Sequence, residues 1–152
     1  MKFTSRKLNL FLLTKLPSAY FSGVRLSSIS DNEVIVKVKH RWINQNPFKS
    51  LYWATQGMAS ELTTGILVMK EIDACGKRIS MLVTQQKGVF TKKARGKILF
   101  SCKDGSKIKD AIAKTIKTGD GQTITMTSSG VDEKGDVVST FEYEWSVKVK
   151  TN

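Results

Sequence analysis

Glu61 is the only carboxylate between His40 and Lys70, in a stretch whose second half has the pattern of an apolar helix. The positions three and four residues away carry Met, Thr and two Gly, so no basic side chain lies within reach of a local ion pair. Glu61 falls on the shoulder of the apolar stripe, and the two glycines indicate that another group packs closely there. Such a carboxylate can act as a base or nucleophile, or can form a buried pair across a subunit interface. Both interpretations stay open.

The densest internal group of cations is formed by Lys87, Lys92, Lys93 and Arg95. The chain carries 25 Lys and Arg against 13 Asp and Glu, a net charge of +12, which favours an anionic partner. The alternative for the cluster is a solvated loop. Nucleic acid is an unlikely partner, because the charge is scattered and no strand shows the aromatic-interleaved basic motif of RNA-binding domains.

The hydrophobic pattern changes period several times along the chain, which predicts an α+β fold. Strands are expected at 24–30, 33–40, 78–90, 97–103, 122–131 and 136–150, and helices at about 4–15, 51–69 and 106–118. Ser50 is the expected N-cap of the long helix. Most connections are short, so we expect a mainly antiparallel six-stranded sheet that wraps around the helix at 51–69.

Residues 1–152 are expected to form one domain, because the length suits a single core and no linker or repeat interrupts it. Cys75 and Cys102 stand without a CxxC motif or a nearby His, which favours reduced thiols in a cytoplasmic protein and no metal site. The apolar run Leu8–Leu13 is shorter than the roughly 7–15 residues of a secretory signal, so an amphipathic N-terminal helix is favoured. No stretch approaches the ~18 apolar residues of a transmembrane helix.

A hairpin followed by a central helix and a curled antiparallel sheet resembles the hotdog-fold acyl-CoA thioesterase superfamily. The segment "NQNPFKSLYWATQGMASELTTG" is similar to the signature of its phenylacetyl-CoA thioesterase branch, where an Asn precedes a helix with an acidic residue about two turns in. "TKKARGKILF" resembles the basic segment of that family, and "VDEKGDVVSTFEYEWSVKVK" resembles its closing hairpin. The resemblance spans roughly residues 20–150 and is closest to a hotdog branch described only as a domain of unknown function.

The resemblance implies that Glu61 is the catalytic carboxylate and that Asn46 orients the thioester carbonyl or a water. The His-Gly-Gly of the family at the helix start is here Tyr52-Trp53-Ala54. Backbone N–H groups around Trp53 and Ala54 lack intrahelical partners, so they can stabilise the oxyanion of a thioester under attack. The basic cluster corresponds to the segment that, in the family, lies near the CoA entrance.

The remaining candidates for the acyl pocket have competing interpretations. Tyr52 and Trp53 can shape the pocket or simply pack in the core. Gln56, Gly57 and Ser60 would line it if their side of the helix faces a second subunit, and would otherwise make ordinary polar contacts. His40 has no catalytic or metal-ligating partner in the sequence pattern and is interpreted as a strand-end residue.

Three functions therefore remain, and they are given in decreasing order of support from the sequence. The first is an acyl-CoA thioesterase that works as a homodimer or dimer of dimers, with pockets between subunits. The second is a non-catalytic protein that binds acyl-CoA or lipid, which the missing His-Gly-Gly favours. The third is a basic nucleic-acid-binding domain. None of these requires a cofactor.

Overall fold

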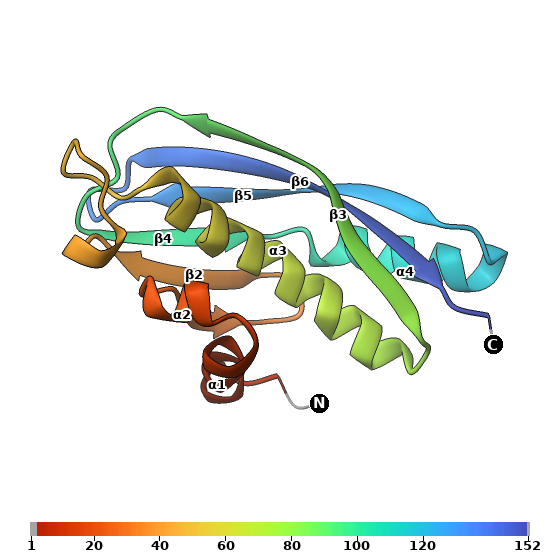
Figure 1. Ribbon diagram of the computed structural model, residues 1–152. Coiled ribbons are helices and arrows are strands. Elements are labelled where there is room, and N and C mark those ends of the chain that lie inside the picture. The colour runs from red at the N-terminus through yellow and green to blue at the C-terminus, as the bar shows by residue number, and fades with distance from the viewer. Residues whose placement is uncertain (1–2, 152) are drawn as a thin grey trace.

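A long helix, α3, lies along one face of a six-stranded sheet in the computed structural model, which describes residues 3–151 (Figure 1). This arrangement confirms the expected hotdog fold. The elements are α1 (Ser5–Lys15), α2 (Pro17–Phe21), β1 (Arg25–Ile29), β2 (Val34–Lys39), the 3-10 turn η1 (Trp42–Asn44), α3 (Trp53–Cys75), β3 (Ile79–Phe90), β4 (Lys97–Cys102), α4 (Gly105–Thr118), β5 (Gln122–Val131) and β6 (Val137–Val149).

The strands are arranged in the order β1-β2-β4-β5-β6-β3, and each pairing is antiparallel. β5 and β6 form the closing hairpin, in which buried Phe141, Tyr143 and Trp145 alternate with more exposed residues. β3 is paired along its length with β6 and forms one edge of the sheet. The long central helix separates β2 from β3 in sequence, which places these two strands far apart in the sheet.

Helix α3 begins and ends later than the expected 51–69. It begins at Trp53, and its N-cap is Tyr52, whose side chain makes no capping hydrogen bond. Ser50 is therefore not the cap; it bonds to Asn46 instead. The helix ends where Gly76 adopts a left-handed conformation with φ of 65°, which a residue with a Cβ adopts less readily.

The face of α3 that packs on the sheet is more polar than the sequence pattern predicts. Leu62 and Ile66 of the expected apolar stripe are buried, whereas Met58 and Met69 are only half-buried. A row of side-chain hydrogen bonds joins the helix to β5 and β6: Gln56 to Ser139 at 2.7 Å, Ser60 to Tyr143 at 2.7 Å, Thr63 to Ser128 at 2.8 Å, and Thr64 to Trp145 at 2.9 Å. These bonds satisfy polar groups that burial would otherwise leave costly.

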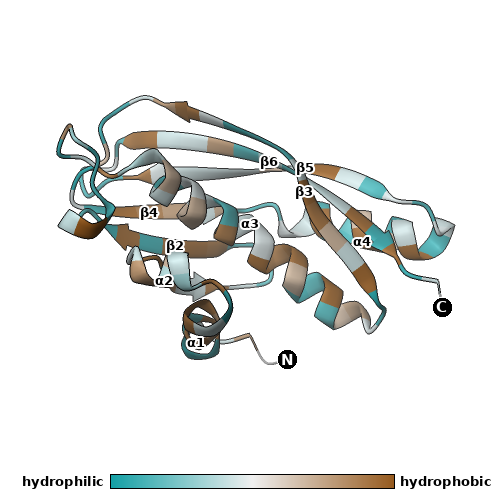
Figure 2. Ribbon diagram, in the orientation of Figure 1, coloured by the Kyte–Doolittle hydropathy of each residue, from teal (hydrophilic) through white to brown (hydrophobic). Residues whose placement is uncertain are grey.

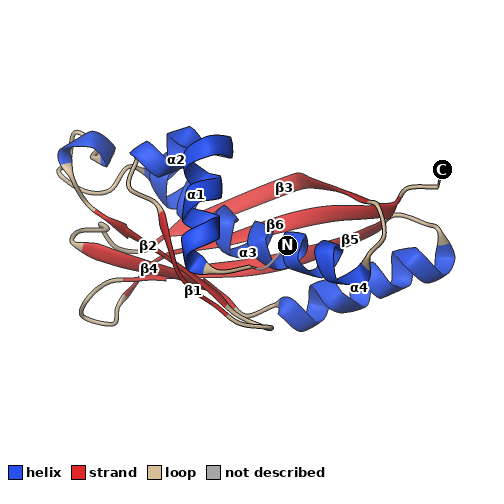
Figure 3. Ribbon diagram, turned by 90° about the horizontal axis from the view of Figure 1, so that it is seen from below, coloured by secondary structure: helices blue, strands red, loops and turns tan. Residues whose placement is uncertain are grey.

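The smaller helices cover opposite parts of the molecule (Figure 3). α1 packs on β1, and α2 continues from it to contact α3. α4 packs against α3, β5 and β6 at the other end, because β4 pairs with only the last part of β5. There the Asp104 carboxylate accepts the N–H of Thr127 at 2.8 Å, and Thr115 Oγ1 accepts the N–H of Val149 at 3.0 Å.

Candidate functional site

Glu61 points from the middle of α3 toward the corner between α1 and α2. Its half-buried side chain lines a cavity of about 250 Å³, together with Met58 and Leu62 of the same helix. The opposite wall is the corner Lys15–Ala19. The cavity therefore joins one carboxylate to largely apolar walls, and it lies within a single chain.

The Glu61 carboxylate has no hydrogen bond or ion pair with any residue in the described range 3–151. Burial, with no compensating cation, raises the pKa of Glu61 above its ordinary value of 4.5. The nearby Tyr143 hydroxyl has its pKa raised to about 12, chiefly by burial and also by the charge of Glu61. A carboxylate with a raised pKa is a stronger base for activating water than an ordinary surface glutamate.

Gly65, one turn after Glu61, leaves the space that this carboxylate occupies. A Cβ at residue 65 would lie 3.2 Å from Glu61 Oε1 and 3.4 Å from Trp145 Cζ2. The group that packs closely at this glycine is therefore the glutamate itself, together with the indole ring. A Cβ at Gly57 would meet only Phe141 Cε1, at an ordinary 4.0 Å.

A second, larger cavity of about 510 Å³ lies at the start of α3. It gathers several residues that the sequence pattern selected, from two stretches of the chain, 46–56 and 90–94. Its walls are Asn46, Pro47, Phe48, Ser50, Leu51, Tyr52, Trp53, Gln56, Phe90, Thr91, Lys92, Lys93 and Ala94. The apolar side chains and the lysines give this cavity an amphipathic lining.

The first turn of α3 offers backbone donors to this cavity. The N–H groups of Trp53 and Ala54 have no acceptor among the described residues, and the first intrahelical bond runs from Gln56 N–H to the Tyr52 carbonyl at 3.2 Å. Uncapped N–H groups and the positive end of the helix dipole favour an anion or a polarised carbonyl oxygen. The expectation of free donors at Trp53 and Ala54 thus has a structural basis, while their catalytic use stays a prediction.

Asn46 is already engaged by its own loop. Its Oδ1 accepts the N–H groups of Phe48 at 3.0 Å and Ser50 at 3.2 Å, and its Nδ2 donates to Ser50 Oγ at 2.9 Å. These bonds hold the turn in which Lys49 adopts a φ of 57°. Asn46 thereby shapes the rim of the larger cavity, and a direct role toward a substrate stays a prediction.

Gln56, Gly57 and Ser60 face the sheet of their own chain. The Gln56 side chain donates to the Leu51 carbonyl at 3.1 Å and accepts from Ser139 at 2.7 Å. Ser60 is fully buried against Tyr143, whose hydroxyl also donates to the Gly57 carbonyl at 3.0 Å. Gln56 lines the larger cavity, whereas Gly57 and Ser60 line neither of the two cavities described above.

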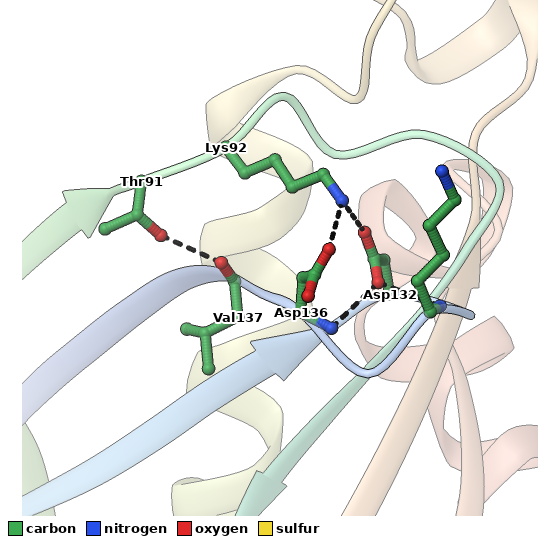
Figure 4. A network of polar contacts seen from close by, with 6 residues as sticks. Thr91, Lys92, Asp132, Asp136 and Val137 are labelled. Atoms are coloured by element: carbon green, nitrogen blue, oxygen red, sulfur yellow. Dashed lines mark hydrogen bonds and ion pairs between the residues drawn. The ribbon is translucent and has the colours of Figure 1, made fainter.

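The predicted basic cluster divides into three parts. Lys92 is held between Asp132 and Asp136, with both distances 2.7 Å, so its charge is engaged within the chain (Figure 4). Lys87 lies on the outer face of the sheet with Glu142 and Glu144. Lys93 lines the larger cavity, as Lys92 also does, and Arg95 contacts the loop that forms its rim.

Lys93 and Arg95 are attached to the loop that Asn46 holds. Lys93 Nζ lies 5.8 Å from the centre of the Phe48 ring, and Arg95 Nε donates to the Lys49 carbonyl at 3.2 Å. Neither has an ion pair with a described carboxylate. These two cations are therefore the better candidates for an anionic group of a ligand.

Two features of the Glu61 cavity could not be predicted from the sequence pattern. The corner between α1 and α2 contributes one wall, although the only local signal is Pro17, which is compatible with the start of a helix. Tyr143 approaches Glu61 from a strand 82 residues away, and the alternation of β6 predicts only that it faces inward. Neither position follows without the folded arrangement of the chain.

The two cavities share no lining residue. Gln56 and Glu61 are about 140° apart around the helix and about 8 Å apart along it, so one faces the sheet and the other faces α1 and α2. Asn46 and the first turn of α3 are therefore not brought to Glu61 within one described chain.

Other kinds of site find no support in the described residues. No set of three or more His, Cys, Asp or Glu side chains in residues 3–151 is arranged to hold a metal ion. Cys102 is buried and Cys75 half-buried, and both are free. Within the same range, no helix combines the length and the apolar character that a membrane span requires.

The long central helix on a six-stranded antiparallel sheet defines a protein of the hotdog class. The profile of one family, described as "Domain of unknown function (DUF4442)", matches residues 5–147. The chain therefore belongs to the DUF4442 family. A search of the curated proteins finds no match.

Solved structures share this fold. A Pseudomonas aeruginosa protein of unknown function, described as a "Probable Thioesterase", is similar over 99% of each chain, with a TM-score of 0.82 and 20% identity. A thioesterase from Haemophilus influenzae covers 98% of this chain and 93% of its own, with a TM-score of 0.72 and 13% identity. A Gln-to-Ala variant of a Staphylococcus aureus thioesterase covers 89% and 99%, with a TM-score of 0.67 and 13% identity. At such identities the likeness establishes the fold.

Proposed function

We propose that this protein is a thioesterase that hydrolyses acyl-CoA or a related thioester, with Glu61 as the catalytic carboxylate. The observation that carries the proposal is the half-buried Glu61 side chain, which faces a largely apolar cavity without any ion-pair partner in the described chain. An unpaired buried carboxylate costs stability, so it is more easily explained by a chemical role than by packing. The apolar walls suit an acyl chain.

The ionised Glu61 takes a proton from water, and the resulting hydroxide attacks the thioester carbonyl. The carbonyl oxygen then carries a negative charge, which N–H donors stabilise. Collapse of the tetrahedral intermediate breaks the C–S bond, and the leaving thiolate takes the proton that Glu61 holds, which regenerates the carboxylate. One water and one thioester thus give a carboxylic acid and a thiol. Direct attack by Glu61 to form an anhydride that water then cleaves is the second route compatible with the same residue.

We further propose a homodimer, or a dimer of dimers, in which α3 of one protomer presents its first turn to Glu61 of its partner. The separation of the two cavities within one chain supports this arrangement. The edge strand β3 supports it as well, because it is 12 residues long and exposes Leu82 and Val89. A long edge strand with exposed apolar side chains is a template for pairing with a second chain.

The S. aureus thioesterase adds a spacing argument. That protein has been solved with a glutamine replaced by alanine and with a glutamate replaced by alanine, and the two positions are 15 residues apart. Asn46 and Glu61 have the same separation here. The match supports the pairing of an amide side chain with a helix carboxylate in the proposed site.

For the CoA portion, we propose that Lys93 and Arg95 contact phosphate groups, because both are free of ion pairs and lie beside the rim of the larger cavity. Lys92 is less favoured because it is paired with Asp132 and Asp136, and Lys87 because it lies with Glu142 and Glu144 on the outer face of the sheet. Lys93 and Arg95 share a pocket with Asp132 and Glu133, but neither forms an ion pair with a described carboxylate. We propose the cytoplasm as the location, because free Cys75 and Cys102 are most easily maintained in a reducing compartment.

The decisive experiment measures hydrolysis of a panel of short, long and aromatic acyl-CoA esters by the wild type, Glu61→Gln and Glu71→Gln. Glu71 is a half-buried carboxylate of the same helix and serves as the matched control. We expect Glu61→Gln to lower kcat by about 10² to 10⁴ and Glu71→Gln to leave it unchanged. An active enzyme that tolerates Glu61→Gln would show that another group performs the chemistry.

Subunit complementation tests the composite site. Glu61→Gln and Asn46→Ala subunits are each expected to be nearly inactive alone, and they are mixed under conditions that exchange subunits. If each site takes Glu61 from one chain and Asn46 from the other, random mixing restores about a quarter of wild-type activity, since heterodimers contain one intact site. Circular dichroism of Asn46→Ala checks that its loop still folds. Recovery that never exceeds either parent would place both residues in the same subunit.

Non-catalytic binding of acyl-CoA is the second candidate, and one observation favours it. The Asn46 side chain is hydrogen-bonded within its own loop, and the start of α3 carries the bulky side chains of Tyr52 and Trp53. Calorimetry on the same acyl-CoA panel separates the two functions. Saturable binding of several esters with no thiol release would establish a binding protein.

A further inference from the structure

One end of the molecule exposes large apolar side chains from η1 and from the loop between η1 and α3. We call this set the aromatic end, and its members are Trp42 (82% exposed), Phe48 (68%) and Ile43 (58%). Tyr52, Trp53 and Phe90 are exposed beside it but line the larger cavity, which belongs to the proposed subunit contact, so they are not counted here. Figure 2 shows η1 at this end with hydrophobic colouring among largely hydrophilic loops.

Backbone hydrogen bonds hold these segments together. The Tyr52 N–H donates to the Asn44 carbonyl at 2.9 Å, which fixes η1 to the start of α3. The Leu51 N–H donates to the Ala94 carbonyl at 2.8 Å, which fixes the same place to the loop after β3. The exposed aromatic side chains therefore project from a fixed frame, not from a free loop.

Cations are interleaved with the aromatic end. Arg41 precedes Trp42, Lys49 follows Phe48, and Lys93 Nζ lies 5.8 Å from the Phe48 ring. Arg95 Nε donates to the Lys49 carbonyl at 3.2 Å. No Asp or Glu occurs in residues 34–60 or 88–103, the segments that build this surface. The two segments therefore present large exposed apolar side chains and several cations, and they contain no Asp or Glu that could pair with those cations.

The nearest carboxylates known from contacts belong to the turn between β5 and β6. Asp132 and Asp136 both bind Lys92 at 2.7 Å, and Asp132 Oδ1 also accepts the N–H of Asp136 at 3.0 Å (Figure 4). Glu133 of the same turn lies over Gly96 and shares a pocket with Lys93 and Arg95. The three acids of this turn therefore stand against six cations at this end of the molecule: Arg41, Lys49, Lys92, Lys93, Arg95 and Lys134. The field in front of the aromatic end is positive.

We propose that the aromatic end docks on the surface of an anionic phospholipid bilayer. A second copy of the chain fits it poorly, because a two-fold contact through this surface sets the cations of one copy against those of the other. A lipid surface satisfies both kinds of side chain, since aromatic rings favour the headgroup region and Lys and Arg attract anionic lipid. The proposal does not depend on the thioesterase activity.

Vesicle flotation tests this docking. The wild type is mixed with vesicles of phosphatidylcholine alone, or with vesicles in which about a third of the lipid is phosphatidylglycerol. We expect binding to the anionic vesicles only, weakened by salt as surface charges are screened. Trp42→Ser with Ile43→Ser removes exposed side chains that line neither cavity, and we expect its vesicle affinity to fall about tenfold or more.

Charge and apolar controls make the test specific. Arg41→Gln with Lys49→Gln lowers the net charge by as much as Lys114→Gln with Lys117→Gln on α4, and we expect only the first pair to lose about tenfold in affinity. Leu10→Ser removes an equally exposed apolar side chain from α1 and should bind normally. Equal losses in both charge pairs, or equal binding to neutral vesicles, would overturn the proposal.

Tryptophan fluorescence reports the contact directly. Trp42 is 82% exposed, so entry into the headgroup region should shift the emission to the blue, while buried Trp145 and Trp53 at the proposed subunit contact stay constant. Trp42→Phe should lose most of this shift and still float. If vesicles never bind and the Trp42→Ser, Ile43→Ser variant instead lowers the oligomeric mass in light scattering, the aromatic end is a contact between copies and the lipid proposal is wrong.

Discussion

The Glu61 carboxylate lies over Gly65, in the space that a side chain at residue 65 would fill. A Cβ there would lie 3.2 Å from Glu61 Oε1, and the Trp145 ring closes the other side at 3.4 Å. Gly65 destabilises the helix by about 1 kcal/mol relative to Ala, because glycine has a low helix propensity. The missing side chain leaves room for the unpaired Glu61 carboxylate. This relationship links the sequence of the helix to the position of its one candidate catalytic group.

Gly65→Ala is expected to displace the carboxylate. The gain in helix propensity is offset by the crowding of Glu61 and Trp145, so the free energy of unfolding should change by less than about 1 kcal/mol. If Glu61 is catalytic, kcat/KM should fall at least about tenfold, because the reacting group is misplaced. Chemical denaturation and steady-state kinetics measure the two effects.

Gly57→Ala in the same helix is the matched control for stability. Its Cβ would meet only Phe141 at 4.0 Å, so we expect a gain of about 0.5–1 kcal/mol in the free energy of unfolding. If Gly65→Ala stabilises the protein as much as Gly57→Ala does, the neighbours of Gly65 move freely and the carboxylate is not confined as described.

Glu61→Gln should stabilise the protein at neutral and alkaline pH. Burial raises the folded-state pKa of Glu61 above 4.5, so the folded wild type binds more protons than the unfolded chain, and its stability falls as pH rises through this window. Gln carries no charge to bury. We expect a gain of about 1 kcal/mol near pH 8, roughly 2–4 °C in Tm.

The stability gain of Glu61→Gln over the wild type should shrink toward zero as the pH is lowered below 4.5, because Glu61 is then protonated in the folded and the unfolded protein. Thermal unfolding at several pH values follows the trend, and Glu71→Gln is the control. A gain that stays constant across the pH range would mean that the charge of Glu61 is not the source of the cost.

The strands could be predicted closely because their alternation is local. The expected ranges 78–90 and 122–131 correspond to β3 (Ile79–Phe90) and β5 (Gln122–Val131). The strand order was not accessible, since the pairing of β2 with β4 across α3 depends on contacts distant in sequence. Helix α2 was also missed, because five residues are too few to show a helical period.

The candidate site was only partly predictable. The absence of a local cation beside Glu61 follows from spacing along the helix, and residues 3–151 contain no ion pair to this carboxylate. The engagement of Lys92 by Asp132 and Asp136 could not be foreseen, because it joins two turns some 40 residues apart. The polar face of α3 escaped notice because Ser60 and Thr63 resemble surface residues until their partners on the sheet are known.

Tyr143→Phe should destabilise the contact between α3 and the sheet. It removes the group that bonds Ser60 at 2.7 Å and the Gly57 carbonyl at 3.0 Å, and both partners are left without this bond. We expect a loss of about 1–3 kcal/mol in the free energy of unfolding, measured by urea denaturation. Tyr52→Phe, at a surface site without such a bond, should change it by less than about 0.5 kcal/mol.

A double-mutant cycle isolates the bond itself. Ser60→Ala and Tyr143→Phe together should cost at least about 0.5 kcal/mol less than the sum of the single changes, because the second change removes a partner that is already unsatisfied. Strict additivity would show that the hydroxyl pair does not contribute as a unit.

Lys92→Gln and Lys93→Gln are expected to act in different ways although they are neighbours. Lys92 lowers the pKa of Asp132, chiefly through their hydrogen bond, so it contributes stability above the ordinary aspartate value of 3.8, and this contribution is lost as pH falls through the lowered pKa. Its removal should speed amide exchange in the turn between β5 and β6 at neutral pH and leave affinity for CoA little changed.

Lys93→Gln should leave that exchange unchanged and weaken CoA binding about tenfold, since its charge is free to meet a phosphate. Calorimetry with CoA and with pantetheine, which lacks the nucleotide phosphates, separates a phosphate contact from a general effect on the pocket. If Lys93→Gln weakens the binding of CoA and leaves the binding of pantetheine unchanged, the contact of Lys93 with a phosphate is supported. Equal weakening by Lys92→Gln, with unchanged exchange in the turn, would instead assign the phosphate to Lys92 and show that its bridge to Asp132 and Asp136 opens when the ligand binds.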